Sequence, residues 1–203
     1  MKTLIKKKTT ISDSDNLILL CNSKSKLSDF NLSNQELDYI KKGHKDKKEI
    51  IVINQYGRYV FVITPKKEKE PNSHAENCRM LGDKLAEKLK DEGSALILDL
   101  EENQTETLQI TEGIALSNYT FTKHKTDPKP NKLHTIYLCK NSNQKDIDEL
   151  QNIVDAVYFT RDLINEPFSH LTAKDLANAA LKSGRKYGFK TTVLDKKKIE
   201  SLK

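Results

Sequence analysis

The sequence predicts an α/β fold in which a mixed or mostly parallel sheet is flanked by helices. Short, continuous aliphatic runs, typical of strands buried on both faces, recur along the chain. Between them lie longer segments whose apolar residues return every three or four positions, which is the helical period. Strand, helix, strand, helix, strand is the pattern of parallel strands joined by crossover helices.

Four elements are expected in the first third of the chain. Residues 17–21 form a fully apolar run and predict a buried strand, and residues 34–42 predict a short helix. Two β-branched runs follow, at 50–53 and 59–63, and the short connection between them contains Gly57. A glycine in so short a connection predicts a β-hairpin.

The central third continues the alternation. A helix is expected to begin with an N-cap at residues 72–73 and to stop at Gly93. A buried strand at 95–98, a helix at 105–121 and a further strand at 133–139 follow it.

The last third begins with a polar segment, residues 140–145. A long helix at 147–165 follows, and proline stops it. Thr172 then caps a helix that ends at Gly188. We expect a strand at 190–194 and a helix that opens at Asp195 and is still running at the end of the sequence.

The polar segment predicts the domain boundary. The expected parts are an N-terminal domain (1–141), an interdomain helix (142–165) and the opening of a second α/β domain (166–203). One strand between two helices does not bury its own faces. The second domain is therefore expected to continue beyond this chain.

Composition excludes several classes of protein. The 203 residues carry 35 Lys+Arg and 29 Asp+Glu, a net charge of +6, and no apolar run is long enough to cross a membrane. Residues 1–10 contain lysines without the apolar segment of a secretory signal. The cysteines are odd in number and form no CxxC pair, which predicts free thiols in a reducing compartment, the cytoplasm: Cys21, Cys78 and Cys139.

No catalytic motif is visible. The histidines are scattered, HExxH and GxSxG are absent, and the glycines never form the GxG of a dinucleotide or phosphate loop. Asp99, Glu101 and Glu102 are the one carboxylate cluster at the carboxyl end of a predicted strand, where α/β folds bind ligands. Such a cluster is either a ligand site or a solvated strand end, and the sequence leaves both open.

The basic residues gather in the first third of the chain. They are lysines interleaved with acids, and Arg58 is the only arginine among residues 1–70. This pattern is typical of a solvated surface, although a nucleic-acid footprint stays open as an alternative. We do not expect nucleic-acid binding.

Two stretches resemble the leucyl (cytosol) aminopeptidase family. Residues 160–167 read T-R-D-L-I-N-E-P and resemble the R-D-L-x-N-x-P run that ends the family's interdomain helix; residues 171–173 resemble the cap of its next helix. Residues 112–125 are similar to the E-G…Y-x-F-x-x-Y-K element of its N-terminal domain, with His124 in place of the second Tyr. The matched positions, for which we expect structural roles, are Glu112, Gly113, Tyr119, Phe121, Lys125, Arg161, Asp162, Asn165 and Pro167.

The resemblance implies a metal-dependent exopeptidase that removes N-terminal residues from peptides. The full-length enzyme would be a cytoplasmic homo-hexamer using two divalent metals, Zn or Mn. The family's metal-binding motifs do not occur here, so no catalytic, cofactor-binding or metal residue is carried over, and the chain alone is expected to be inactive. The family's N-terminal domain resembles a macro domain in fold, so the alternative is a macro-like module that binds a nucleotide or a nucleic acid.

Overall fold

The computed structural model describes residues 2–139 and 142–202. It divides into two compact units, Met1–Tyr158 and Phe159–Lys203, called here the N-terminal unit and the C-terminal unit. The predicted domain boundary at 141 and 142 touches residues 140–141, which lie outside the described residues.

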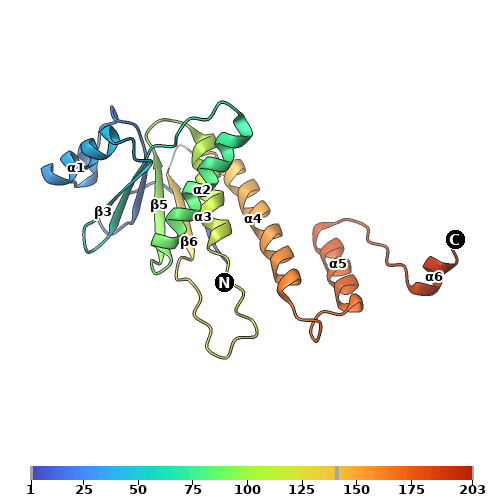
Figure 1. Cartoon of the computed structure of the whole chain (residues 1–203). Helices are drawn as coiled ribbons and strands as arrows, with labels where there is room; N and C mark the ends of the chain where they lie inside the picture. Colours follow the sequence, from blue (N-terminus) through green and yellow to red (C-terminus); the bar gives the residue numbers. More distant parts are fainter. Residues whose placement is uncertain (1, 140–141, 203) are drawn as a thin grey trace. The chain divides into compact units, whose positions relative to one another are not determined.

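The N-terminal unit is built on a six-stranded mixed sheet with the order β1-β6-β5-β2-β4-β3 (Figure 1). β3 runs antiparallel to β4, and all other neighbours are parallel. This confirms the predicted fold class and the hairpin. The strands are β1 (Leu4–Lys8), β2 (Leu17–Leu20), β3 (Ile50–Asn54), β4 (Tyr59–Ile63), β5 (Ser94–Asp99) and β6 (Thr135–Cys139).

The continuous apolar runs are explained by burial on both faces of this sheet. In β2, Leu17 and Leu19 point to one core cluster, whereas Ile18 and Leu20 point to the other. All four are 1% exposed or less. A strand with a single buried face would alternate apolar and polar residues, so the run itself indicates a central strand.

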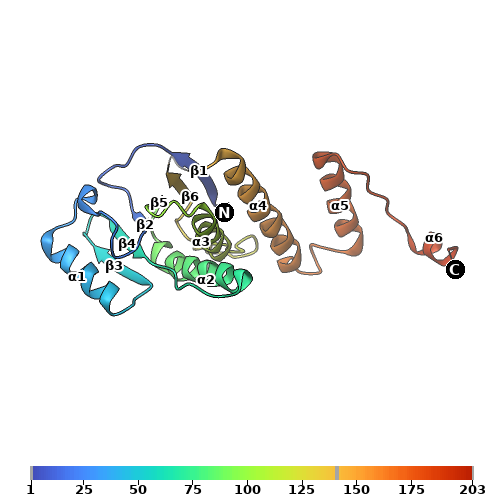
Figure 2. The same ribbon diagram turned by 90° about the horizontal axis from the view of Figure 1, so that it is seen from above.

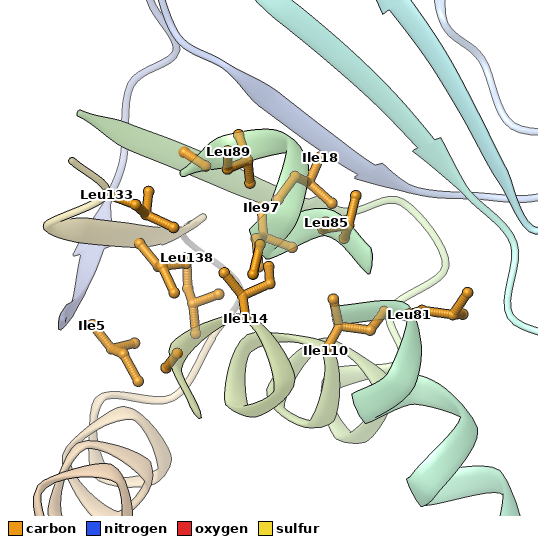
Figure 3. Close-up of a cluster of buried hydrophobic side chains, with 14 of the residues drawn as sticks. Ile5, Ile18, Leu81, Leu85, Leu89, Ile97, Ile110, Ile114, Leu133 and Leu138 are labelled. Atoms are coloured by element: carbon orange, nitrogen blue, oxygen red, sulfur yellow. The ribbon is translucent and has the colours of Figure 1, made fainter. Parts of the chain in front are cut away.

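Helices α2 (Pro71–Leu89) and α3 (Gln104–Ser117) cover one face and lie side by side (Figures 1 and 2). Their packing depends on two glycines. A Cβ on Gly82 would lie 2.3 Å from the Ile110 carbonyl oxygen, and one on Gly113 would lie 2.1 Å from the Arg79 carbonyl oxygen. The helices approach this closely only because neither position has a side chain. The core beneath them is shown in Figure 3.

Helix α1 (Asn34–Lys45) and the 3-10 turn η1 (Ser28–Phe30) pack on the other core cluster. A capping box starts α1, because the Ser33 hydroxyl accepts from the Glu36 N–H and the Glu36 carboxylate accepts from the Ser33 N–H. The N-terminal unit is therefore a three-layer α/β/α arrangement.

Helix α4 (Gln144–Asn165) begins in the N-terminal unit and buries Ile147, Leu150, Val154 and Tyr158 there. It also holds the edge strand β1. The Gln151 side chain accepts a hydrogen bond from the Ile5 N–H (2.7 Å) and donates one to the Thr3 carbonyl (3.3 Å).

The C-terminal unit contains α5 (Ala173–Tyr187) and α6 (Lys196–Glu200). The expected caps of α5 are confirmed. Thr172 forms a capping box with Asp175, and Gly188 adopts left-handed backbone with φ of 77° at the helix end. Large apolar side chains of the unit are exposed, among them Phe168 (82%) and Leu202 (68%).

Two strand predictions were wrong. Strand β1 was missed because its sequence, LIKKK, is dominated by lysines; only Ile5 is buried in the core, as expected for an edge strand. The strand expected at 190–194 does not form. No strand among the described residues pairs with it, and an extended segment without a partner leaves its backbone groups to solvent.

Several helix boundaries also differ; α1 runs on to Lys45, and α2 ends at Leu89, before the expected stop at Gly93. Helix α2 starts at Pro71, one position before the expected cap, since proline suits the first helical turn. Helix α3 ends at Ser117, so Tyr119 and Phe121 lie in the following loop. Helix α6 ends at Glu200 and is followed by a turn.

Candidate functional site

The carboxyl ends of β2 and β5 are the place where this sheet topology favours a ligand. The two strands are parallel neighbours. The chain leaves β2 toward η1 and α1 on one face, and leaves β5 toward α3 on the other. Open α/β sheets bind ligands where neighbouring connections diverge in this way.

Glu101 lies at this place and joins the two strand ends. Its carboxylate accepts hydrogen bonds from the Asn22 N–H (3.2 Å), from the Asn22 side-chain amide and from the Ser25 hydroxyl (2.5 Å). Asp99 supports Glu101 by accepting from its N–H (2.9 Å) and from the Thr107 hydroxyl (3.0 Å). Two of the three carboxylates picked out in the sequence therefore hold the loop after β2.

The thiol beside this joint is not activated as a nucleophile. Cys21 follows β2 directly and is 1% exposed. Burial, and after it the charge of Glu101, raises the pKa of the Cys21 thiol to about 12, so the thiol stays protonated. Glu102, the third acid of the cluster, is exposed in left-handed backbone with φ of 55°. Asp99 and Glu101 therefore form a structural joint between the end of β5 and the loop after β2.

A second cluster surrounds a buried carboxylate in the first turn of α3. Glu106 is 4% exposed, accepts a hydrogen bond from Lys67 Nζ and lies 2.7 Å from His74 Nε2. His74 Nδ1 lies 3.2 Å from the Lys66 carbonyl oxygen, and Cys78 Sγ lies 3.9 Å from His74 Nε2. These contacts place a thiol, an imidazole and a carboxylate next to one another in space, in that order.

The chemistry of this second cluster is limited by the thiol. Burial, and after it the charge of Glu106, raises the pKa of Cys78 to about 11, and the side chain is fully buried. A buried, protonated thiol is a small hydrophobe rather than a nucleophile. Sequence reasoning missed the cluster because Glu106 is 39 residues from Lys67 and 32 from His74, and no local motif joins them.

The donor set does not fit the two-metal centre that the resemblance implies. In the part of the chain that the structure describes, no group of three or more His, Cys, Asp or Glu side chains is arranged to hold a metal ion. The best-placed carboxylates, Asp99 and Glu101, already accept several hydrogen bonds each. No step of metal chemistry is therefore assigned to this chain's residues.

The expected motif residues Glu112 and Gly113 lie where α3 meets α2. Glu112 accepts a hydrogen bond from Arg79 Nε (2.7 Å), and this bond is the main cause of the raised pKa of the Arg79 guanidinium. Gly113 provides the close approach to the Arg79 backbone described above. Together they fix one helix against the other.

The remaining upstream motif residues lie in the loop after α3. Tyr119 packs against the core, with its ring edge-to-face to that of Tyr158 at a centroid distance of 5.0 Å. Phe121 is tilted against His124 at 5.8 Å. Lys125 is exposed, and its N–H donates to the Thr122 carbonyl (3.1 Å).

The downstream motif residues belong to the C-terminal unit and shape the end of α4. The Asn165 side chain donates to the Arg161 carbonyl (2.8 Å), and the Asp162 carbonyl accepts from the Glu166 N–H (3.2 Å). The Pro167 carbonyl accepts hydrogen bonds from the N–H groups of His170 (2.8 Å) and Leu171 (3.0 Å). These contacts turn the chain from α4 toward α5.

A shallow surface hollow of about 500 Å³ lies along the first turns of α2. Its lining residues are five polar or charged side chains and one methionine: Glu68, Asn72, Ser73, Glu76, Asn77 and Met80. Among the described residues, no helix has the length and apolar character needed to span a membrane.

The chain is similar in sequence to several proteins described as probable cytosol aminopeptidases. The relative from Sulfurihydrogenibium sp. is 31% identical over 156 residues, which is 71% of this chain and 31% of the relative. The relative from Clostridium perfringens is 34% identical over 102 residues, 46% of this chain and 21% of the relative. One from Chlorobaculum parvum is 58% identical over 43 residues, 21% of this chain and 8% of the relative. The matched part is thus about a third or less of these relatives' length.

Solved structures share the fold. A mutant of tomato leucine aminopeptidase superimposes with a TM-score of 0.71 at 14% identity, covering 99% of this chain and 46% of that one. The bottromycin maturation enzyme BotP in complex with Mn gives a TM-score of 0.65 at 13% identity, covering 93% of this chain and 40% of that one.

No family model matches the sequence. The relative that carries the family relationship is the one from Sulfurihydrogenibium sp., whose match at 31% identity takes up 71% of this chain. Over the part of its relatives' length that it spans, the chain belongs to the cytosol aminopeptidase family.

Proposed function

We propose that this chain supplies the N-terminal, non-catalytic part of a metal-dependent aminopeptidase that removes N-terminal residues from peptides. The observation that carries the proposal is the 156-residue match to the Sulfurihydrogenibium relative, which takes up most of this chain but 31% of the relative. The N-terminal unit would be a structural support, and the C-terminal unit would be the opening of the catalytic domain.

The way this chain uses its polar groups supports a structural role. Glu101 ties the loop after β2 to the end of β5, and Glu112 ties α3 to α2. Both thiols beside carboxylates, Cys21 and Cys78, have raised pKa values. The two carboxylates thus serve to hold elements of the fold together, and neither thiol is activated as a nucleophile.

The resemblance implies two divalent metals, Zn or Mn, in the whole enzyme. The donors among the described residues do not fit such a centre, so we propose that the ligands come from other residues of the whole protein. Assembly as a homo-hexamer, peptide substrates and a cytoplasmic location are part of the same proposal and follow from the family.

The test compares the chain with a chimera. Residues of this chain replace the matched segment of the Sulfurihydrogenibium relative, and hydrolysis of leucine amide with Mn²⁺ is measured for both proteins. The chain alone is expected to give only the rate of the metal blank, whereas the chimera is expected to turn over substrate. Circular dichroism of the chain serves as the folding control. Turnover by the chain alone, or a folded but inactive chimera, would contradict the proposal.

The alternative, a macro-like module for nucleotides or nucleic acid, gains no support from the site. The place where the topology favours a ligand holds the Glu101 carboxylate, whose negative charge disfavours a phosphate. Titration calorimetry with ADP-ribose is expected to show no binding heat.

A further inference from the structure

The two edge strands of the sheet differ in how well they are protected against pairing with another chain. β1 forms one edge and β3 the other. Natural sheets usually block an edge strand, because its unpaired N–H and C=O groups otherwise pair with another chain. In this protein one edge is blocked and the other is open.

The β1 edge is blocked by charge and by a helix. Its sequence carries three consecutive lysines, Lys6, Lys7 and Lys8. Gln151 of α4 occupies the outward N–H of Ile5 and the carbonyl of Thr3. A second strand could add here only by breaking these bonds.

The β3 edge has no such protection. Its sequence, IIVIN, contains no charged residue. Hydrogen bonds to the β4 side run from the Thr64 N–H to the Glu49 carbonyl (2.9 Å) and from the Gln55 N–H to the Arg58 carbonyl (3.0 Å). In an antiparallel ladder this fixes the alternation, so the backbone groups of Ile50, Val52 and Asn54 face outward.

No described residue pairs with these outward groups: β3 has β4 as its one strand neighbour, and no side chain bonds them. The side chains of Ile50 and Val52 are also only half-buried, although they pack against the core beside α2 and α3. An added strand would pair with these outward N–H and C=O groups. It would also bury the exposed part of the two side chains.

We propose that the β3 edge is an interface at which a second copy of this chain adds its own β3, antiparallel and about a two-fold axis. This inference concerns the N-terminal unit and does not depend on the proposed function. A two-fold pairing is closed, so both open edges are consumed and no further copy can add through the β3 edge.

This register brings no like charges together. With Val52 on the axis, Ile50 lies opposite Asn54 of the second copy and Glu49 lies opposite Gln55, so no like charges meet. The same register carries Lys48 toward Tyr56, a ring that is 100% exposed at the tip of the hairpin. A cation near an exposed aromatic face is favourable.

The first test is the mass of the 203-residue chain by sedimentation velocity over a range of concentrations. The expected result is a monomer–dimer equilibrium. Val52→Pro should shift it to monomer, because proline removes the outward N–H at the axis without removing a bond to β4. The matched control is Lys7→Pro, which removes an outward N–H from the β1 edge and should leave the dimer intact. Circular dichroism checks that both variants are folded.

Hydrogen exchange of the unmutated chain keeps the proposal testable if Val52→Pro does not fold. The amides of Ile50, Val52 and Asn54 should exchange more slowly as the dimer forms. A chain that is monomeric at every concentration would overturn the proposal. So would a dimer in which these amides exchange as fast as in the monomer, or one in which protection appears on α5 instead. Protection that requires an added extended peptide rather than a second copy would also reject it.

Discussion

The N-terminal and C-terminal units obey the same local rules but differ in packing. Helices α1 and α5 both begin with a complete capping box. Yet α1 buries Ile40 in a core, whereas Gly184 is the buried residue of α5 and Leu176 is 50% exposed. Local signals thus define where a helix begins and ends, but a layer of other elements is needed to bury it. An isolated helix of 15 residues is marginal in water.

The largest expected effect is the loss of stability when a buried side chain of the N-terminal unit is truncated. The same truncation of a half-exposed side chain in the C-terminal unit should have little effect. Ile114→Ala removes a fully buried side chain between α3 and the sheet, and should lower the free energy of unfolding by about 3 kcal/mol. Leu176→Ala on α5 should change it by less than about 0.5 kcal/mol, because that side chain is half exposed. Urea denaturation followed by circular dichroism measures both. Equal losses in the two variants would mean that the units are packed alike.

Glycine substitutions probe the same difference. Gly113→Ala places a methyl group against the Arg79 backbone, and should destabilise the N-terminal unit by about 2 kcal/mol even after the gain in helix propensity. Gly57→Ala is the matched control, since nothing lies within 4 Å of its new Cβ. Gly184→Ala meets the Thr191 hydroxyl and the Phe189 carbonyl, but should leave the main urea transition unchanged because little else packs on that segment. An unchanged transition for Gly113→Ala would reject the close helix contact.

The two capping boxes give a smaller effect. Ser33→Ala should lower the stability of the N-terminal unit by about 1 kcal/mol, because it leaves a helix N–H without its acceptor. Thr172→Ala removes the same kind of bond from α5 and should reduce helical signal without moving the main urea transition. A shift of that transition by Thr172→Ala would show that α5 is coupled to the core.

The smallest effect is on pH dependence in α5. The hydrogen bond from the Thr172 hydroxyl, and after it that from the Thr172 N–H, lowers the pKa of Asp175 below its ordinary value of 3.8. The ionised form is therefore favoured in the helix. Its contribution is present above the ordinary pKa and is lost as the pH falls through the lowered one.

An NMR pH titration of the Asp175 carboxyl measures this pKa. Thr172→Ala should return the midpoint toward the ordinary value, and the α5 signals should shift toward coil in the same acid range. The α1 box offers a comparison, since the Ser33 N–H lowers the pKa of Glu36 in the same way. A midpoint for Asp175 at or above 3.8 in the unmutated chain would contradict the capping geometry.

Most of the sheet could be predicted from the sequence because its strands are buried on both faces. The runs at β2 and β4 have no polar interruption, and the short connection with Gly57 identified the hairpin. β1 could not be predicted in this way, because an edge strand with one buried side chain carries no continuous apolar signal. The strand expected at 190–194 failed for the opposite reason, since its apolar residues have no neighbouring strand among those described.

The candidate site was predictable only in part. Asp99 and Glu101 were found because they follow a strand in sequence, but their hydrogen bonds to Thr107 and to the loop at Asn22 depend on tertiary structure. The pairing of Glu106 with His74 depends wholly on the contact between α2 and α3. Of the two glycines that allow this contact, Gly113 was picked out by the family resemblance, whereas Gly82 gives no sequence signal beyond its presence in a helix.

The two units should differ most clearly in their native-state hydrogen exchange. Native-state hydrogen exchange is recorded for the chain alone and for the chimera with the Sulfurihydrogenibium relative. In the chain alone, amides of β2, β4 and β5 should exchange slowly and those of α5 rapidly. In the chimera, α5 should gain protection comparable to that of the sheet, because the added catalytic part covers its apolar side. If α5 is already as protected as β2 in the chain alone, or stays unprotected in an active chimera, the C-terminal unit is not the opening of a catalytic domain.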